Sequence, residues 1–158
     1  MIQVWSTDIT YVPMKRGFLY LVAVMDWYSR YVLSWQLSNS LGIDFCLEAL
    51  EKAFQHGNPE IFNTDRGAQF TARKFVAKLQ ERNIRVSMDG KGRALDNIFI
   101  ERLWRDVKYN QIYIYNNKDG KSLYEGLKQY FLLHNERKPH SSLNYRTPAQ
   151  VYFEILEK

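Results

Sequence analysis

The feature that most constrains the fold is an unbroken apolar run, Phe18 to Met25, which is rich in β-forming residues. A strand without polar positions is typical of the interior of a sheet, where both of its faces are covered. An alternating segment over residues 3–12 precedes it across a turn at Pro13 to Gly17. A third strand, Tyr31 to Leu37, follows a tight connection at Asp26 to Arg30. These strands predict an antiparallel meander.

After the third strand the pattern changes to an alternation of helices and strands. Three antiparallel strands followed by this alternation predict an α/β fold with a mixed five-stranded sheet, three antiparallel strands and then two parallel ones, and helices on both faces. The later segments are predicted as a helix over 43–54, a strand over 60–63, a helix over 71–82 with Phe75, Val76 and Leu79 inward, a strand over 84–88, a mobile loop over 89–94, a long helix from Leu95 with Asp96 as its N-cap, a helix over 119–133, a polar irregular segment over 134–145, and a last helix opened by Thr147 and Pro148.

Composition excludes several classes of protein. The 158 residues, 46% of them hydrophobic and 25% charged, predict one globular domain with room for a short tail. No apolar run reaches the roughly 18–20 residues of a membrane helix, and the N-terminus has no signal-peptide pattern. With Cys46 as the single cysteine, a disulfide framework and a cysteine zinc site are both excluded. We therefore expect a soluble, cytoplasmic protein.

The basic residues are unevenly distributed. The formal net charge is +5, from 22 basic and 17 acidic residues. Residues 1–84 carry 9 basic and 8 acidic side chains, whereas residues 85–158 carry 13 and 9. The second half therefore holds most of the excess, which favours a polyanionic partner there.

Three carboxylates are candidates for chemistry. Asp8 lies within the first predicted strand, and Asp65 directly follows the fourth, where ligands gather in open α/β sheets. Glu101 lies on the long helix. Each has an ordinary structural interpretation: a satisfied edge residue, a turn aspartate, and one half of an i, i+4 ion pair with Arg105. Together they could converge at one end of the sheet and supply oxygen ligands for two Mg²⁺ ions about 3.5–4 Å apart.

The long helix carries two stripes. Its apolar stripe predicts a buried face, and beside it lies a polar stripe that contains Glu101. The preceding Gly90 to Arg93 lacks the glycine spacing and ending of a Walker motif, and we interpret it as a basic loop that could touch DNA phosphates. The apolar stripe is Ile100, Leu103, Trp104 and Val107, and the polar stripe is Asn97, Glu101, Arg105 and Lys108.

These motifs carry a resemblance. Thirty-five residues separate Asp65 from Glu101, Asp65 lies in a Thr-Asp-x-Gly-x-x-Phe context, and Glu101 lies in an Asp-Asn-x-x-x-Glu context. The chain resembles the D,D-35-E signature of retroviral integrases. More narrowly, it resembles the catalytic core of insertion-sequence transposases of the IS-three family, OrfB type. The matching segments run in order along nearly the whole chain: Trp5–Tyr11, Thr64–Phe70, Ser87–Met88 with Gly90–Gly92, Asp96–Arg102, Lys108, Asn135–Arg137 with His140 and Leu143, and Thr147–Pro148.

The resemblance implies a ribonuclease-H-like fold and an enzyme that cleaves phosphodiesters and transfers DNA strands. It implies that Asp8, Asp65 and Glu101 bind two Mg²⁺ ions, with Mn²⁺ as a substitute and no small-molecule cofactor. It further implies a homodimer or higher multimer on transposon-end and target DNA, in the bacterial cytoplasm near the nucleoid. We assign residues 1–133 to the catalytic core and 134–158 to a C-terminal extension with a short helix on or next to the core. The expected DNA contacts are Lys108, Arg105, Lys91, Arg93 and Asn97.

The sequence departs from the family pattern at three places. Asn63–Thr64 replaces a common His-Ser pair, Asp89 follows Ser87–Met88 where a serine is usual, and His134–Asn135 replaces Tyr-Asn. Asp89 could weaken DNA binding locally. Family members also usually carry an N-terminal helix-turn-helix region, so we expect this chain to be a fragment, a truncated gene product or an excised domain.

Two other functions stay open. The chain could be a catalytically silent fragment that binds DNA or full-length transposase and inhibits it, or a ribonuclease H-type hydrolase with the same metals. A tyrosine recombinase is disfavoured, because only eight residues lie between Arg137 and Tyr145 and no upstream arginine helix is present. No Gly-x-Ser-x-Gly elbow supports a serine hydrolase. We expect the aromatic residues of the first strands to pack in the core rather than to stack on bases.

Overall fold

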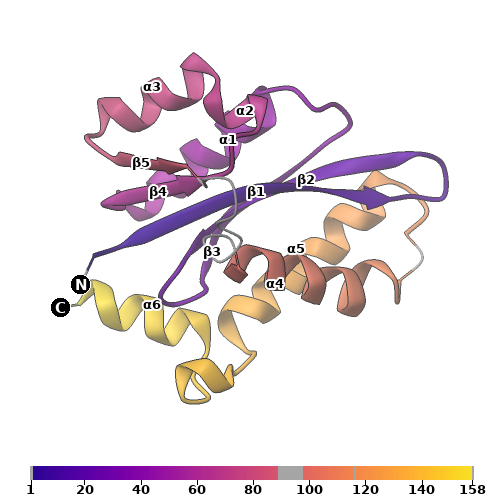
Figure 1. Ribbon diagram of the computed structural model, residues 1–158. Helices are drawn as coiled ribbons and strands as arrows, with labels where there is room; N and C mark the ends of the chain where they lie inside the picture. Colours follow the sequence, from indigo (N-terminus) through magenta and orange to yellow (C-terminus); the bar gives the residue numbers. More distant parts are fainter. Residues whose placement is uncertain (1, 89–97, 116, 158) are drawn as a thin grey trace.

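A computed structural model describes residues 2–88, 98–115 and 117–157. The chain forms a single mixed sheet with helices on both faces (Figure 1). The predicted loop over 89–94, the Asp96 N-cap, and Lys91, Arg93 and Asn97 lie outside the described residues.

The sheet has five strands in the order β3-β2-β1-β4-β5. The first three pair antiparallel, whereas β4 pairs parallel to both β1 and β5, so the predicted mixed sheet is confirmed. The strands are β1 (Val4–Pro13), β2 (Phe18–Asp26), β3 (Val32–Ser38), β4 (Ile61–Thr64) and β5 (Arg85–Met88).

Strand β2 is covered on both faces, as its apolar run predicted. Val22 and Val24 belong to one core, and Leu21, Ala23 and Met25 belong to the other. Because successive side chains of a strand point to opposite faces, these two sets define two hydrophobic layers separated by the sheet.

The first core is covered by α1 (Asp44–Ala53), η1 (Phe54–His56), α2 (Ala68–Thr71) and α3 (Arg73–Glu81). Cys46 is buried on the apolar face of α1, and burial raises the pKa of its thiol to about 12. The second core is covered by α4 (Ile98–Val107), the π-helical segment η3 (Lys108–Ile112) and α5 (Gly120–Glu136). In Figure 1 these two groups of helices lie on opposite sides of the sheet.

Two helix predictions were wrong in detail. The predicted helix over 71–82 is two helices, because Ala72 adopts an extended conformation (φ −60°, ψ 139°) between α2 and α3. Val76 is only half-buried, whereas Phe75 and Leu79 are buried. Among the aromatic residues that we expect to pack in the core, Tyr28 is exposed instead.

Helix α5 continues to Glu136, three residues beyond its predicted end. The side-chain amide of Asn135 pairs with the backbone of Val32 in both directions, at 2.9 and 3.0 Å, and so replaces a neighbouring strand at that point. His134 bonds the carbonyl oxygen of Arg30 at 2.9 Å. These contacts fix the end of α5 to the connection between β2 and β3.

The last helix, α6 (Pro148–Leu156), follows the short η4 (Ser141–Leu143). Thr147 caps it as predicted, with Gln150 completing a capping box and Pro148 in the first turn. Its Tyr152 ring stacks on Tyr31 at 4.7 Å between centroids and belongs to the first core. The division of the chain at residue 133 stays a prediction. Within the described ranges, no helix is long and apolar enough to cross a membrane.

Candidate active site

The pairing of β1 with β4 brings Asp8 and Asp65 together. The last registered pair of these parallel strands is Ser6 with Asn63. Asp8 and Asp65 each lie two residues further along, so the pleat directs both side chains to the same face. Two aspartates that are 57 positions apart in sequence therefore meet where β4 ends beside the middle of β1.

The Asp8 carboxylate lies next to a second acid, Asp65, and accepts one hydrogen bond from a neighbouring helix, α4. Burial raises the pKa of Asp8 to about 7, and the negative charge of Asp65 adds to that effect. The indole N–H of Trp104 on α4 opposes it by donating to Asp8 Oδ2 at 3.1 Å. Among the described residues, no cationic side chain forms an ion pair with this carboxylate. The site therefore holds negative charge that no ion pair with the described residues neutralises.

Gly67 holds Asp65 in place. Its backbone N–H donates to Asp65 Oδ1 at 2.7 Å, which fixes the carboxylate in a tight turn after β4. A Cβ atom at position 67 would lie 2.8 Å from that same oxygen, closer than real Cβ contacts allow. The glycine two residues after Asp65 is therefore required by the position of the carboxylate.

A cavity of about 330 Å³ opens beside the two aspartates. It lies between the ends of β1 and β4 and the start of α2, with an aromatic wall from β1, β2 and α2. Its lining residues are Asp8, Ile9, Thr10, Tyr11, Tyr20, Leu41, Asp65, Gly67, Gln69 and Phe70.

Glu101 is not brought into contact with the two aspartates. It is exposed on α4, three residues before Trp104, which corresponds to roughly 4.5 Å along the helix axis. In the part of the chain that the structure describes, no three His, Cys, Asp or Glu side chains gather closely enough to hold a metal ion. Nor does a salt bridge join Glu101 to Arg105 there. The three-carboxylate site stays a prediction.

The apolar stripe of α4 is confirmed, since Ile100, Leu103, Trp104 and Val107 are all buried in the second core. Lys108 follows it as the first residue of η3. Its ammonium lies 5.3 Å from the centroid of the Tyr11 ring, which lines the cavity. Lys108 therefore lies next to a residue that lines the cavity, whereas Arg105 is exposed without a hydrogen bond or ion pair to the described residues.

The donor chemistry of this site fits a divalent cation. Hard cations such as Mg²⁺ prefer carboxylate oxygens, and a bound cation would relieve the repulsion between Asp8 and Asp65. The residues that would hold it are Asp8 and Asp65, with Glu101 as the third candidate.

Sequence reasoning missed Trp104 as part of the site, because its position in an apolar stripe indicated core packing. One signal could have found it: a buried indole N–H needs an acceptor, and Trp104 lies one turn from Glu101. The separation of Trp104 from Asp8 in the sequence does not indicate that Asp8 is the acceptor.

Comparison with known proteins identifies the family of this chain. Two family models, each described as integrase core domain, match residues 1–94 and 82–148. The chain belongs to the integrase core domain family. The transposase for insertion sequence element IS904 of Lactococcus lactis is 31% identical over 155 residues, which cover 92% of this chain and 59% of the relative. Transposase InsF for insertion sequence IS3A of Escherichia coli is 35% identical over 114 residues, covering 70% and 40%.

The resemblance to IS-three-family transposases is thus confirmed, and this chain spans about half the length of these relatives. Solved structures share the fold. The HTLV-2 integrase catalytic core domain in complex with magnesium superposes with a TM-score of 0.76 at 19% identity, covering 94% of each chain. The catalytic core domain of BIV integrase gives 0.78 at 16% identity, covering 98% of this chain and 95% of that one. The predicted ribonuclease-H-like fold is confirmed.

Proposed function

We propose that this integrase core is the catalytic domain of a DNA transposase, which cleaves phosphodiesters and transfers DNA strands with divalent metal ions. The observation that carries the proposal is the meeting of Asp8, in the middle of β1, with Asp65, directly after β4, beside an open cavity. Like charges held together without a protein cation favour a metal-dependent reaction over a purely structural role.

Asp8 and Asp65 would hold the metal, and Glu101 would complete the set. When two Mg²⁺ ions are bound, they supply activation of the attacking oxygen and stabilisation of the leaving oxygen, and Mn²⁺ could substitute. The Trp104 N–H orients Asp8 by occupying Oδ2, and the Gly67 N–H orients Asp65 by occupying Oδ1. Each aspartate thus keeps one oxygen that these donors do not occupy.

Lys108 would position the DNA. Its ammonium lies over the ring of Tyr11, which lines the cavity, and a phosphate of a strand approaching the aspartates could accept from it. Arg105 on the exposed side of α4 would extend this contact. Lys91, Arg93 and Asn97, outside the described residues, are retained as contacts on sequence grounds.

As partners we propose transposon-end and target DNA, with the protein acting as a homodimer or higher multimer in the bacterial cytoplasm. The relatives are named as transposases of insertion sequences, which supports DNA as the partner. The residues support no small-molecule cofactor, since metal-assisted phosphoryl transfer needs only carboxylates and a nucleophilic hydroxyl.

The direct test is a strand-transfer assay with pre-cut transposon-end DNA and Mg²⁺ or Mn²⁺. We expect joined products with the wild-type chain and none with Asp65→Asn, while Asp44→Asn, an exposed aspartate on α1, retains activity. Activity that survives Asp65→Asn would contradict the assignment.

The open position of Glu101 favours one alternative, a catalytically silent fragment that binds full-length transposase. In that case this chain would not join DNA, but it would inhibit joining by a longer transposase that does. Cleavage of RNA–DNA hybrid in the same assay, without joining, would indicate a ribonuclease H-type hydrolase instead.

A further inference from the structure

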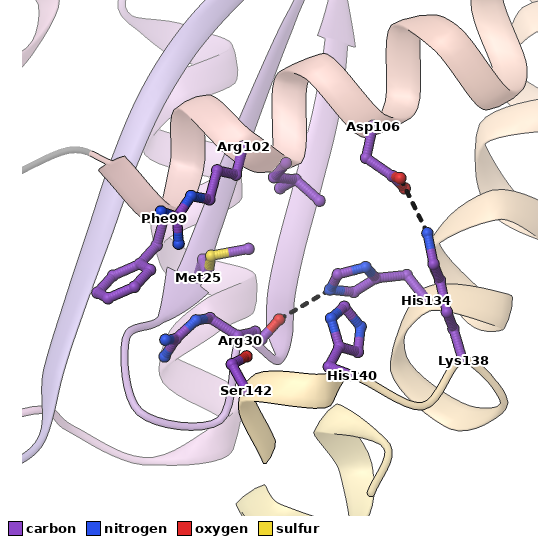
Figure 2. Close-up of a pocket in the computed structure, with 10 residues that line it drawn as sticks. Met25, Arg30, Phe99, Arg102, Asp106, His134, Lys138, His140 and Ser142 are labelled. Atoms are coloured by element: carbon purple, nitrogen blue, oxygen red, sulfur yellow. Dashed lines mark hydrogen bonds and ion pairs between the residues drawn. The ribbon is translucent and has the colours of Figure 1, made fainter. Parts of the chain in front are cut away.

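A second cavity lies on another side of α4. It has a volume of about 200 Å³ and shares no lining residue with the cavity beside Asp8 and Asp65. Figure 2 shows its walls, which come from the β2–β3 connection, from α4, and from the end of α5 with the segment that follows. The lining residues are Met25, Arg30, Phe99, Arg102, Leu103, Asp106, His134, Lys138, His140 and Ser142.

Two guanidinium groups, those of Arg30 and Arg102, face this cavity, and the negative charge of Asp26 acts on Arg30. Arg30 is anchored by hydrogen bonds to the carbonyl oxygens of Trp27 and Tyr28, and its guanidinium lies 3.6 Å from the centroid of the Phe99 ring. Burial and then the positive charge of Arg102 lower the pKa of Arg30. Among the described residues, no carboxylate forms a salt bridge with either arginine. The two cations therefore repel each other, and an anion between them would relieve that repulsion.

The one carboxylate in the wall is already neutralised. Asp106 accepts from Lys138 Nζ at 2.9 Å, from Asn110 Nδ2 at 2.8 Å and from the hydroxyl of Tyr130. With Asp106 and Lys138 paired, the two arginines leave two positive charges in the wall.

Neutral donors complete the cavity. His140 lines the cavity, and its Nε2 is buried without a hydrogen-bond partner among the described residues. The Ser142 hydroxyl lies beside Arg30 in the view of Figure 2. Two cations and two neutral donors in a small concave site are the groups that recognise a tetrahedral oxyanion.

We propose that this cavity binds a phosphate group, held by Arg30 and Arg102 with His140 and Ser142 as hydrogen-bond donors. Its volume suits one phosphate group, since cavities for drug-sized ligands start at roughly 300 Å³. The group comes either from free inorganic phosphate or from the backbone of DNA. The inference does not depend on the proposed metal site, because the two cavities share no residue.

The test compares the wild-type chain with Arg102→Gln and with Arg73→Gln. Arg102 and Arg73 are both exposed helix residues, and Arg73 lies on α3 across the sheet, so both variants should fold. We expect sodium phosphate to raise the melting temperature of the wild-type chain above that in sodium chloride at equal ionic strength. By titration with ³¹P detection, Arg102→Gln should bind inorganic phosphate about tenfold or more weakly, whereas Arg73→Gln should bind like wild type.

Two arms separate the sources of the phosphate. If the group belongs to DNA, Arg102→Gln weakens binding of a short duplex and inorganic phosphate competes with the duplex; if it is the free ion, duplex binding is unchanged while phosphate binding falls. Either result supports the site. The proposal is overturned if phosphate stabilises the wild-type chain no more than chloride, or if Arg102→Gln and Arg73→Gln bind phosphate equally.

Discussion

Two aspartates, Asp8 next to α4 and Asp106 on α4 itself, have opposite surroundings. Asp8 lies next to Asp65 and receives one side-chain hydrogen bond, from Trp104, and burial raises its pKa to about 7. Asp106, two residues after Trp104, is also partly buried, but the hydrogen bonds from Tyr130 and Lys138 outweigh that burial and lower its pKa.

The difference separates a carboxylate with a full set of donors from one for which we propose a chemical role. A buried acid with a full set of donors stabilises the native state, whereas one held against a second acid destabilises it until a cation is supplied.

The largest expected effect is on catalysis at Asp8. Asp8→Asn should lower DNA joining by about a thousandfold or more, since removing one member of a catalytic unit commonly has such an effect. Its free energy of unfolding at pH 7 should not fall, because the neutral amide keeps an acceptor for Trp104 and removes repulsion from Asp65. A large loss of stability, measured by urea unfolding, would show that Asp8 resembles Asp106 instead.

The next largest effect is a loss of folding stability at low pH, caused by His134, which lies near Asp106. Burial lowers the pKa of His134 to about 4 from its ordinary 6.5, although the hydrogen bond to the Arg30 carbonyl opposes this shift. The charge of Asp106 also opposes it, whereas the charges of His140 and Lys138 add to it. The unfolded state therefore binds a proton that the folded state excludes. Stability from this group is complete above pH 6.5 and falls on the order of 2–3 kcal/mol as the pH falls to 4.

The measurement compares urea unfolding of Asp8→Asn with that of the double variant Asp8→Asn/His134→Gln between pH 7 and 4. The shared Asp8→Asn change removes a group whose raised pKa would shift stability in the opposite direction over much of this range. If both proteins lose stability equally, His134 does not titrate as expected.

A smaller effect is expected at Asp106 itself. Asp106→Ala should lower the free energy of unfolding by about 1–2 kcal/mol, because Tyr130 and Lys138 lose their shared acceptor. Unfolding in urea at pH 7 gives the value. An unchanged stability would mean that the hydrogen bonds to Asp106 contribute little, and the contrast with Asp8 would fail.

The smallest effect is expected at Lys108. Lys108→Gln should weaken binding of a short DNA duplex by about threefold and reduce the slope of log affinity against log salt by about one, as the loss of one phosphate contact predicts. Fluorescence anisotropy over a salt series measures both. Lys74→Gln, an exposed lysine on α3, is the matched control, and equal slopes for the two variants would contradict a contact at Lys108.

The sheet could be predicted from the sequence because its signals are local. The apolar run of β2 indicates burial on both faces, and the stripe of α4 indicates the face that packs on the second core. The break at Ala72 and the extension of α5 through Asn135 could not be predicted, because the first depends on one backbone conformation and the second on a distant strand, at Val32.

The site was predictable only in part. The resemblance selected Asp8 and Asp65, and the register of β1 with β4 explains why they meet. The bond from Trp104 to Asp8 and the facing of Arg30 and Arg102 join residues 96 and 72 positions apart through tertiary packing, which no spacing rule contains. Glu101 is where the prediction and the structure differ: its sequence context fits the family, but its side chain does not gather with Asp8 and Asp65 into a metal-binding group.

The most direct test of the account is a crystal structure of the wild-type chain soaked in Mn²⁺, read from the anomalous scattering of the metal. We expect a peak coordinated by the oxygens of Asp8 and Asp65, with Glu101 turned toward it, and none beside Asp106. A structure with Mn²⁺ at saturating concentration and no peak at these two aspartates would contradict the assignment of this site.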